Sequence, residues 1–213
     1  MQQLVLNIGP AVEPDFDNYV AGPNVEAVAS VRSFAARSTG EAVLYLWGEP
    51  GSGRTHLLHA AASVNPGLVT ADDVESLDAP AQQLLFAAIN QAREGGPAVL
   101  AAGRRPPARL PLREDLRTRL AWGLVYQLKP LSDDEKALHL RSQAARRGLR
   151  LSDEVLGYLL SRLPRDLASL NGVLEALDRY SLAAKRPVTL PLVREALERR
   201  AGQAWLGRHK DNL

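Results

Sequence analysis

The sequence predicts an α/β domain with a parallel sheet, followed by a small domain built only from helices. Short apolar runs alternate with helical segments up to residue 130, an order that is typical of strands joined by helical crossovers. A glycine-rich turn connects the first of these apolar runs to a helix. After residue 130, capping signals and helical periodicity recur without another strand pattern.

Length and composition are those of a globular protein without disulfides. The 213 residues suffice for one α/β domain and a small second one, and 46% of them are hydrophobic and 23% charged. The absence of cysteine excludes disulfides and thiolate metal sites. The net charge of +2 is too small to require a nucleic-acid partner. No apolar run approaches the ~20 residues that span a bilayer, and no secretory signal is evident, so we expect a cytoplasmic protein without a membrane partner.

The first expected elements lie on either side of the glycine-rich turn. Asn24 is expected to cap a helix over 25–38 that ends near Gly40. An apolar run at 43–47 is typical of a buried parallel strand, and apolar spacing predicts a helix over 54–63.

The turn itself matches a phosphate-binding loop except at one position. Residues 48–55 read GEPGSGRT, against the pattern G-x-x-x-x-G-K-[ST], so Arg54 stands at the lysine position. Glycines let backbone N–H groups turn inward around phosphates, but a planar guanidinium need not reach them as an ammonium does. A chance turn is the alternative, and the flanking strand and helix favour the loop. The residues expected to line a nucleotide here are Gly48, Pro50, Gly51, Ser52, Gly53, Arg54, Thr55 and His56.

Two carboxylates follow the next short strand, expected at 68–71. In P-loop ATPases the first such acid holds Mg²⁺ through water and its neighbour polarises the attacking water. A helix N-cap is the alternative for Asp72 and Asp73, and the upstream glycine loop favours the catalytic interpretation. Thr55 and Asp72 would then form the Mg²⁺ site.

The remaining pattern completes a sheet of four parallel strands and a set of lid helices. Expected in the first domain are a helix over 80–94, a strand over 98–102, a helix over 112–120 and a strand over 124–128. The second domain begins with a capping box, Ser132-Asp133-Asp134-Glu135. Its helices are expected to run to 147 and over 153–163, 165–184 and 191–202.

The N-terminal peptide carries an alternating apolar pattern at Leu4, Leu6 and Ile8 before the breaker pair Gly9-Pro10. Such a peptide suits either a partner protein or an edge strand of its own domain, and spacing alone does not decide between them.

Four segments together resemble the AAA+ ATPases, and among them the Hda family of DnaA-related regulatory inactivators. They are residues 44–60 around the glycine loop, 103–107 at sensor 1, 115–123 at the arginine finger and 127–133 at the hinge into the lid. The resemblance spans residues 3 to 200 and implies four regions. These are a clamp-binding peptide at 1–12, an AAA+ domain at 13–130, a helical lid at 131–202 and a tail of unknown role at 203–213.

The same resemblance implies a function in controlling chromosomal replication. Family members bind the DNA polymerase sliding clamp, meet ATP-bound DnaA and trigger hydrolysis of its ATP. Arg119 would be the arginine finger offered in trans, and its alternative is a helix arginine paired with Glu114 or Asp115. The clamp would be bound by Gln3, Leu4, Leu6 and Ile8. The cofactor would be ADP or ATP with Mg²⁺. The resemblance does not decide whether the protein forms a homo-oligomer. No helix-turn-helix domain follows, so sequence-specific DNA binding is not expected.

Departures from the family pattern bear on the protein's own nucleotide chemistry. Arg104 stands at the polar sensor 1 position, and Ala168 at the lid arginine, for which Arg165 could substitute. Asp72 follows Thr55 by only 17 positions, so one strand and one helix are missing, which leaves an edge strand exposed. We therefore expect an ATPase activator rather than an efficient ATPase. An autonomous ATPase resembling a helicase loader and a scaffold with a relic P-loop remain alternatives.

Overall fold

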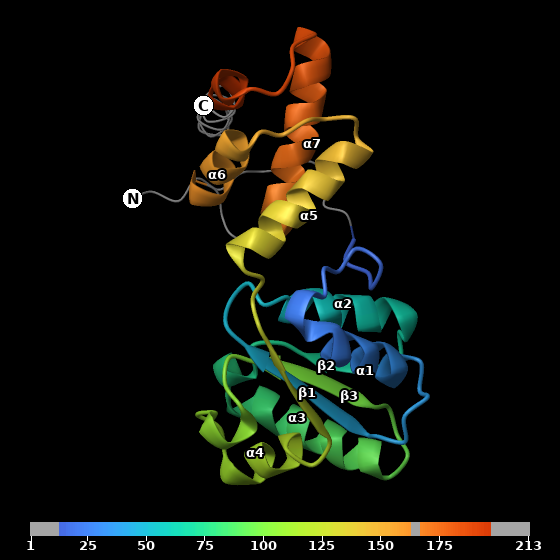
Figure 1. The fold of residues 1–213 in the computed structure, drawn as a ribbon. Helices are drawn as coiled ribbons and strands as arrows, with labels where there is room; N and C mark the ends of the chain where they lie inside the picture. The colour runs from blue at the N-terminus through green and yellow to red at the C-terminus, as the bar shows by residue number, and fades with distance from the viewer. Residues whose placement is uncertain (1–12, 163–166, 197–213) are drawn as a thin grey trace, which may run out of the picture. The chain divides into compact units, whose positions relative to one another are not determined.

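The computed structural model describes residues 13–162 and 167–196, which belong to two units that divide between Leu131 and Ser132 (Figure 1). Several expectations fall outside these residues: the clamp-binding peptide with Gln3, Leu4, Leu6 and Ile8, the lid residue Arg165, and the tail. The two units are described separately below.

The first unit contains a four-stranded sheet in the order β2-β3-β1-β4, in which every pairing is parallel. This confirms the predicted parallel sheet of four strands. The strand that precedes the two carboxylates, β2, is an edge strand that pairs only with β3. The strands are β1 (Val43–Gly48), β2 (Val69–Ala71), β3 (Val99–Gly103) and β4 (Leu124–Leu128).

Helices cover both faces of this sheet, with α1 and α2 on one face and α3 and α4 on the other (Figure 1). Because side chains alternate along a strand, β1 serves both layers. Leu44 and Leu46 join the core beneath α1 and α2, whereas Val43 and Tyr45 join the core above α3 and α4. The helices are α1 (Val25–Ala35), α2 (Arg54–Val64), α3 (Ala79–Arg93) and α4 (Glu114–Leu120), with short 3-10 turns at Gly22–Asn24, Val74–Ser76 and Pro107–Arg109.

The first helix begins at Val25 as predicted, but its last residue and its capping interaction differ from the prediction. It stops at Ala35 rather than at residue 38, and Arg37 has a left-handed φ of 58°. Asn24 occupies the N-cap position, but its side chain makes no capping hydrogen bond. It bonds instead to the Lys129 backbone, with Nδ2 donating to the carbonyl at 2.9 Å and Oδ1 accepting from the N–H at 2.8 Å. The prediction of a capping side chain is therefore wrong, since this amide links the start of α1 to the end of β4.

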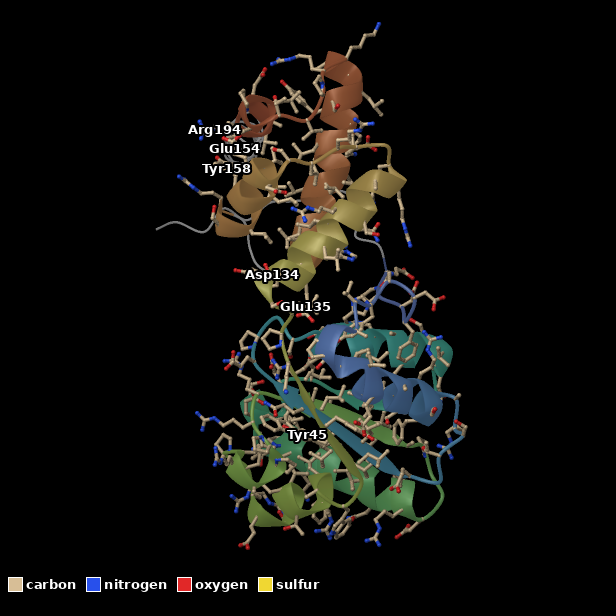
Figure 2. All side chains as sticks on the ribbon, in the orientation of Figure 1. Tyr45, Asp134, Glu135, Glu154, Tyr158 and Arg194 are labelled. Carbon is tan, nitrogen blue, oxygen red and sulfur yellow. The ribbon has the colours of Figure 1, made fainter. Side chains whose placement is uncertain are left out.

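The second unit is helical throughout its described elements. The predicted capping box is confirmed, with Ser132 Oγ accepting from the Glu135 N–H and a Glu135 carboxylate oxygen accepting from the Ser132 N–H at 2.7 Å. The helices are α5 (Asp133–Arg146), α6 (Asp153–Arg162), α7 (Leu167–Ala184) and a further helical stretch over 190–196. Figure 2 shows Tyr158 of α6 close to Arg194 of that last stretch, where the guanidinium carbon lies 5.4 Å from the ring centroid.

Leucine and valine side chains hold these helices together through two clusters, one of which joins α5, α6 and α7 through Leu140, Leu156 and Leu170. Within residues 13–162 and 167–196, no helix is long and apolar enough to cross a membrane.

Candidate functional site

The glycine-rich loop leaves β1 at Gly48 and enters α2 at Arg54. Gly51 and Gly53 have φ values of 83° and 91°, in the left-handed region that favours glycine. At Gly53 there is also no room for a side chain, because a Cβ atom would lie 2.6 Å from Cε2 of Tyr19. The start of α2 has no side-chain cap, so its N–H groups can donate to an anion.

Tyr19 holds the segment before α1 against this loop. Its hydroxyl donates to the Ser52 carbonyl at 3.1 Å, and its ring meets the His56 ring edge-on at 5.2 Å. Burial raises the pKa of Tyr19 to about 12, with a smaller opposing effect from a hydrogen bond with Asn24, so the phenol stays a donor at neutral pH. His56 is engaged in the same segment, with Nε2 2.8 Å from the Asp15 carbonyl.

Two polar side-chain atoms of the loop are buried without a hydrogen-bond partner among the described residues. They are Ser52 Oγ and Arg54 Nη1, and the two side chains belong to residues that are only 4% and 8% exposed. Buried polar atoms are normally satisfied, so orphans call for a ligand or ordered water. A phosphate oxygen could accept a hydrogen bond from each of them. The loop's donors therefore fit a nucleotide phosphate.

Thr55 and Asp72 lie side by side, as the Mg²⁺ interpretation requires. The Thr55 hydroxyl donates to Asp72 Oδ2 at 2.5 Å, and Asp72 Oδ1 accepts from the Asp73 N–H at 2.8 Å. P-loop proteins bind Mg²⁺ with such a pair together with phosphate oxygens and water. No group of three or more histidines or carboxylates able to hold a metal occurs in the described part of the chain, so a cation here would depend on the nucleotide.

Asp73 is held by guanidinium groups. Its Oδ1 lies 3.1 Å from Arg54 Nη2 and 3.9 Å from Arg104 Nε. Arg104 also pairs with Glu75 at 3.3 Å, and its N–H donates to the same carboxylate. The predicted catalytic acid, the residue in place of the lysine and the sensor 1 arginine thus form one network. Asp73 Oδ1 thus faces two guanidinium groups, while the side chain as a whole is 46% exposed.

Tyr45 fixes the chain next to this network, and sequence reasoning did not single it out. It lies within the sheet (Figure 2), and its hydroxyl donates to the Arg105 carbonyl at 2.9 Å. Burial is the main cause of its raised pKa, and the Glu75 carboxylate adds to it. The available signal was a tyrosine in a strand of aliphatic residues, since a buried hydroxyl needs a partner. A cavity of about 590 Å³ opens beside the Arg105 segment, lined among others by Trp47, Arg104, Arg105, Arg109 and Lys129.

Arg119 on α4 pairs with neither of the acids considered as its alternative partners. Its Nε donates to Asn90 Oδ1 at 2.7 Å and its Nη1 to the backbone carbonyl of Asp115 at 3.3 Å. The Asp115 carboxylate instead binds Arg113 at 2.6 Å, and that hydrogen bond is the first cause of the lowered pKa of Asp115. No ion pair of Arg119 occurs within the described residues. Its guanidinium lies over the rings of Phe86 and Trp122 and contributes, as a minor cause, to the lowered pKa of Asp115.

Comparisons with known structures establish the fold family of this arrangement. Domain III of the replication initiation protein DnaA from Thermotoga maritima is similar with a TM-score of 0.69 and 21% identity, over 91% of this chain and 98% of that one. AMPPCP-bound DnaA from Aquifex aeolicus gives 0.63 and 18%, over 76% of this chain and 64% of that one. The Thermotoga maritima RuvB branch migration motor gives 0.60 and 17%, over 87% and 71%. At these identities the similarity shows the AAA+ fold.

The family model described as "Hda, lid domain" matches residues 133–197. The lid segment is thus similar to the Hda lid family, and the chain as a whole has the AAA+ fold. This agrees with the family that the sequence motifs resemble.

Within this AAA+ fold the structure brings some predicted site residues together and leaves others apart. The nucleotide-loop residues, Asp72, Asp73 and Arg104 meet at the ends of β1, β2 and β3, whereas Arg119 lies on α4 among side chains of α3. Sequence reasoning missed Glu75, Phe86 and Asn90, which contact Arg104 or Arg119. No motif marks these three, because their partners lie 29 or more positions away.

Proposed function

We propose that this chain is a regulatory inactivator of the replication initiator DnaA. It would bind the sliding clamp through Gln3, Leu4, Leu6 and Ile8 and stimulate hydrolysis of DnaA-bound ATP with Arg119, so limiting initiation in the cytoplasm. The observation that carries the proposal is the Hda-type lid on a DnaA-like AAA+ unit whose Arg119 has no carboxylate partner among the described residues.

The chemistry required of Arg119 is electrostatic. Negative charge spreads over the transferred γ-phosphoryl group, and a guanidinium placed there stabilises the transition state. A guanidinium already neutralised by a carboxylate would supply less of this effect. Arg119 forms no ion pair among the described residues, although its charge contributes to the lowered pKa of Asp115, and this suits a finger offered to a partner.

The protein's own nucleotide would act as a regulator rather than as a substrate. Ser52 and Arg54 offer buried donors, and Thr55 with Asp72 would hold Mg²⁺ beside ADP or ATP. Arg165 of the lid would complete the site in place of Ala168. Because Asp73 Oδ1 is paired with Arg54 and lies near Arg104, this carboxylate would be a weaker base toward an attacking water, so slow or absent turnover is expected.

The decisive experiment measures hydrolysis of ATP bound to DnaA in the presence of the clamp. Arg119→Ala should lower stimulation by at least about hundredfold, given the size of arginine-finger effects. Arg146→Ala, which removes an exposed lid arginine, is the matched control and should retain it. Gln3→Ala with Leu6→Ala should abolish clamp binding. Unchanged hydrolysis with Arg119→Ala, together with unchanged clamp binding, would overturn the proposal.

One observation favours a second function, an autonomous ATPase: the hydrogen bond between Thr55 and Asp72 is already formed. Steady ATP turnover by the isolated protein would support that function. Calorimetry with ADP and ATP distinguishes these two functions from a scaffold without nucleotide binding. If the wild-type protein binds nucleotide and Arg54→Ala does not, the loop is functional. If the wild-type protein binds no nucleotide, the loop has lost its binding function.

A further inference from the structure

The cavity beside the Arg105 segment gathers positive charge at one place in the sheet unit. Its volume of about 590 Å³ is within the range of small-molecule sites. Its charged lining residues are Arg104, Arg105, Arg109, Lys129 and, as the one acid among the described residues that line it, Glu49. Four cations and one carboxylate give the lining a formal charge of +3. Like charges around one cavity repel one another, so an anion placed there would be stabilised.

The sheet topology explains why a cavity with this lining lies here. Arg104 directly follows β3 and Lys129 directly follows β4, and both strands run parallel to β1, which ends at Gly48. In parallel sheets, ligands bind outside the carboxyl ends of the strands. The lining includes Gly48 and Glu49 but none of residues 50–56. The cavity therefore adjoins the nucleotide loop without containing the loop's buried donors.

Three of the four cations have no partner for their charged groups among the described residues. Arg104 pairs with Glu75 at 3.3 Å, whereas no ion pair or side-chain hydrogen bond of Arg105, Arg109 or Lys129 occurs in that part of the chain. Exposed cations without ion pairs are ordinary on protein surfaces. These three differ because they line one cavity and can therefore reach the same ligand.

Separate contacts fix the backbone of each of the three residues. The Tyr45 hydroxyl donates to the Arg105 carbonyl at 2.9 Å, and the Asn24 amide exchanges two hydrogen bonds with the Lys129 backbone. Arg109 ends a 3-10 turn in which its N–H donates to the carbonyl three positions earlier at 2.9 Å. Since these backbones are held before any ligand arrives, binding would cost less conformational freedom.

We propose that this cavity binds a small molecule that carries two or more phosphate groups, through Arg105, Arg109 and Lys129. Guanidinium groups bind phosphate oxygens with paired hydrogen bonds, and an ammonium adds a point charge. The cations surround one cavity rather than forming a stripe, which favours a small ligand over a nucleic-acid backbone. Trp47 and Pro130 add apolar surface against which an organic part of the ligand can pack.

Calorimetric titration of the full chain with inorganic tripolyphosphate, at about 0.15 M salt, tests this site. The wild-type protein should bind tripolyphosphate, and should bind orthophosphate more weakly because a single phosphate reaches fewer cations. Arg105→Gln, Arg109→Gln and Lys129→Gln should each weaken tripolyphosphate binding by about tenfold, the effect of losing a hydrogen bond to a charged group. The matched control is Arg37→Gln, which removes an exposed arginine of the same unit from outside the cavity and should bind as the wild type does.

The three substitutions change side chains and leave the backbone hydrogen bonds in place, and circular dichroism melting checks that each variant is folded. Arg54→Ala separates the cavity from the nucleotide loop, because tripolyphosphate should still bind to that variant. If Arg54→Ala removes binding while the three cavity variants retain it, the anion occupies the loop and the inference is wrong.

Three further outcomes would overturn the inference. These are the absence of tripolyphosphate binding to the wild-type protein, an equal weakening by Arg37→Gln, and binding of a glutamate-rich peptide in place of tripolyphosphate. The titration contains neither DnaA nor the clamp. Its failure would therefore leave the proposed function of Arg119 untouched.

Discussion

At the scale of single residues, Gly103 lies where no side chain can be accommodated. A Cβ atom there would overlap the Tyr45 hydroxyl and approach Glu75 Oε2 to 2.7 Å. Tyr45 is fully buried and cannot move aside without disturbing the core. We therefore expect Gly103→Ala to lower the free energy of unfolding by about 1–3 kcal/mol, as overpacking does. Urea denaturation of the purified variant measures this directly.

Tyr45→Phe provides the control because it removes the atom that the new methyl group would meet. On its own it should cost about 1 kcal/mol, through loss of the hydrogen bond to the Arg105 carbonyl. In the double variant the loss of unfolding free energy should be smaller than the sum of the two single losses, since a phenyl ring without the hydroxyl would leave space for the new methyl group. Strict additivity would show that the clash is relieved elsewhere.

Residues of local motifs could be predicted from the sequence, whereas residues that act through contacts distant in the sequence could not. The glycines of the loop and the Ser132 capping box depend on positions at most a few residues apart, so a pattern reveals them. Tyr45 bonds a residue 60 positions away, and Asn90 one 29 positions away. Pairings of this kind depend on the strand order and on helix packing, which a single sequence does not specify.

At the scale of elements, Asn24 links the beginning of α1 to the end of β4. Its amide is 4% exposed and exchanges two hydrogen bonds with the Lys129 backbone. Asn24→Ala should lower the free energy of unfolding by about 1–3 kcal/mol, because both bonds are lost next to the core. Asn24→Asp keeps the acceptor for the N–H but cannot donate to the carbonyl. If both variants match the wild type in urea denaturation, the link contributes nothing.

Periodicity predicted the strands and most helices, while the ends of elements depended on tertiary contacts. Apolar runs bounded by glycine and proline marked all four strands to within a residue or two. The end of α1 escaped prediction because Arg37, and not a glycine, adopts the left-handed conformation there. A hydrogen bond from the Arg37 N–H to the Phe34 carbonyl accompanies this early stop.

Helix α5 contains a group whose protonation should affect the stability of the lid. Half-burial is the main cause of the lowered pKa of His139, with Arg146 and Arg147 adding to it and Asn171 of α7 opposing it. The folded lid therefore favours the neutral imidazole. Its stability contribution is fully present above the unfolded pKa of about 6.5 and is lost as pH falls toward the lower folded value.

Melting temperatures measured between about pH 5 and pH 7.5 test this expectation. The wild-type lid should melt at lower temperature as pH decreases, and His139→Gln should flatten that dependence over the same interval. Glu135 acts in the same direction at lower pH, since hydrogen bonds from Ser132 lower the pKa of its carboxyl group. An equal slope in the variant and the wild type would exclude His139 as the cause.

At the scale of the whole molecule, each hydrophobic cluster found among residues 13–162 and 167–196 is drawn from a single unit. Leu44 lies in a cluster drawn from residues 16 to 128, and Leu159 in one drawn from residues 155 to 196. Both are at most 1% exposed, so truncation to alanine should destabilise the unit concerned by about 2–5 kcal/mol. Amide hydrogen exchange resolves which unit is affected. Leu159→Ala should speed exchange in residues 132–162 and 167–196 and leave the sheet protected, and Leu44→Ala should do the reverse.

The same pair of variants connects stability to the proposed activity. Arg119 lies in α4, and the rings it contacts belong to Phe86 of α3 and to Trp122 just after α4, all within the sheet unit. Leu159→Ala should therefore leave the stacking of Arg119 on Phe86 and Trp122 intact, which the tryptophan fluorescence of Trp122 can report against Trp122→Phe as a blank. Leu44→Ala should loosen it together with the sheet core. Faster exchange in both units of either variant would mean that the two units unfold as one, and that Arg119 depends on the lid as well.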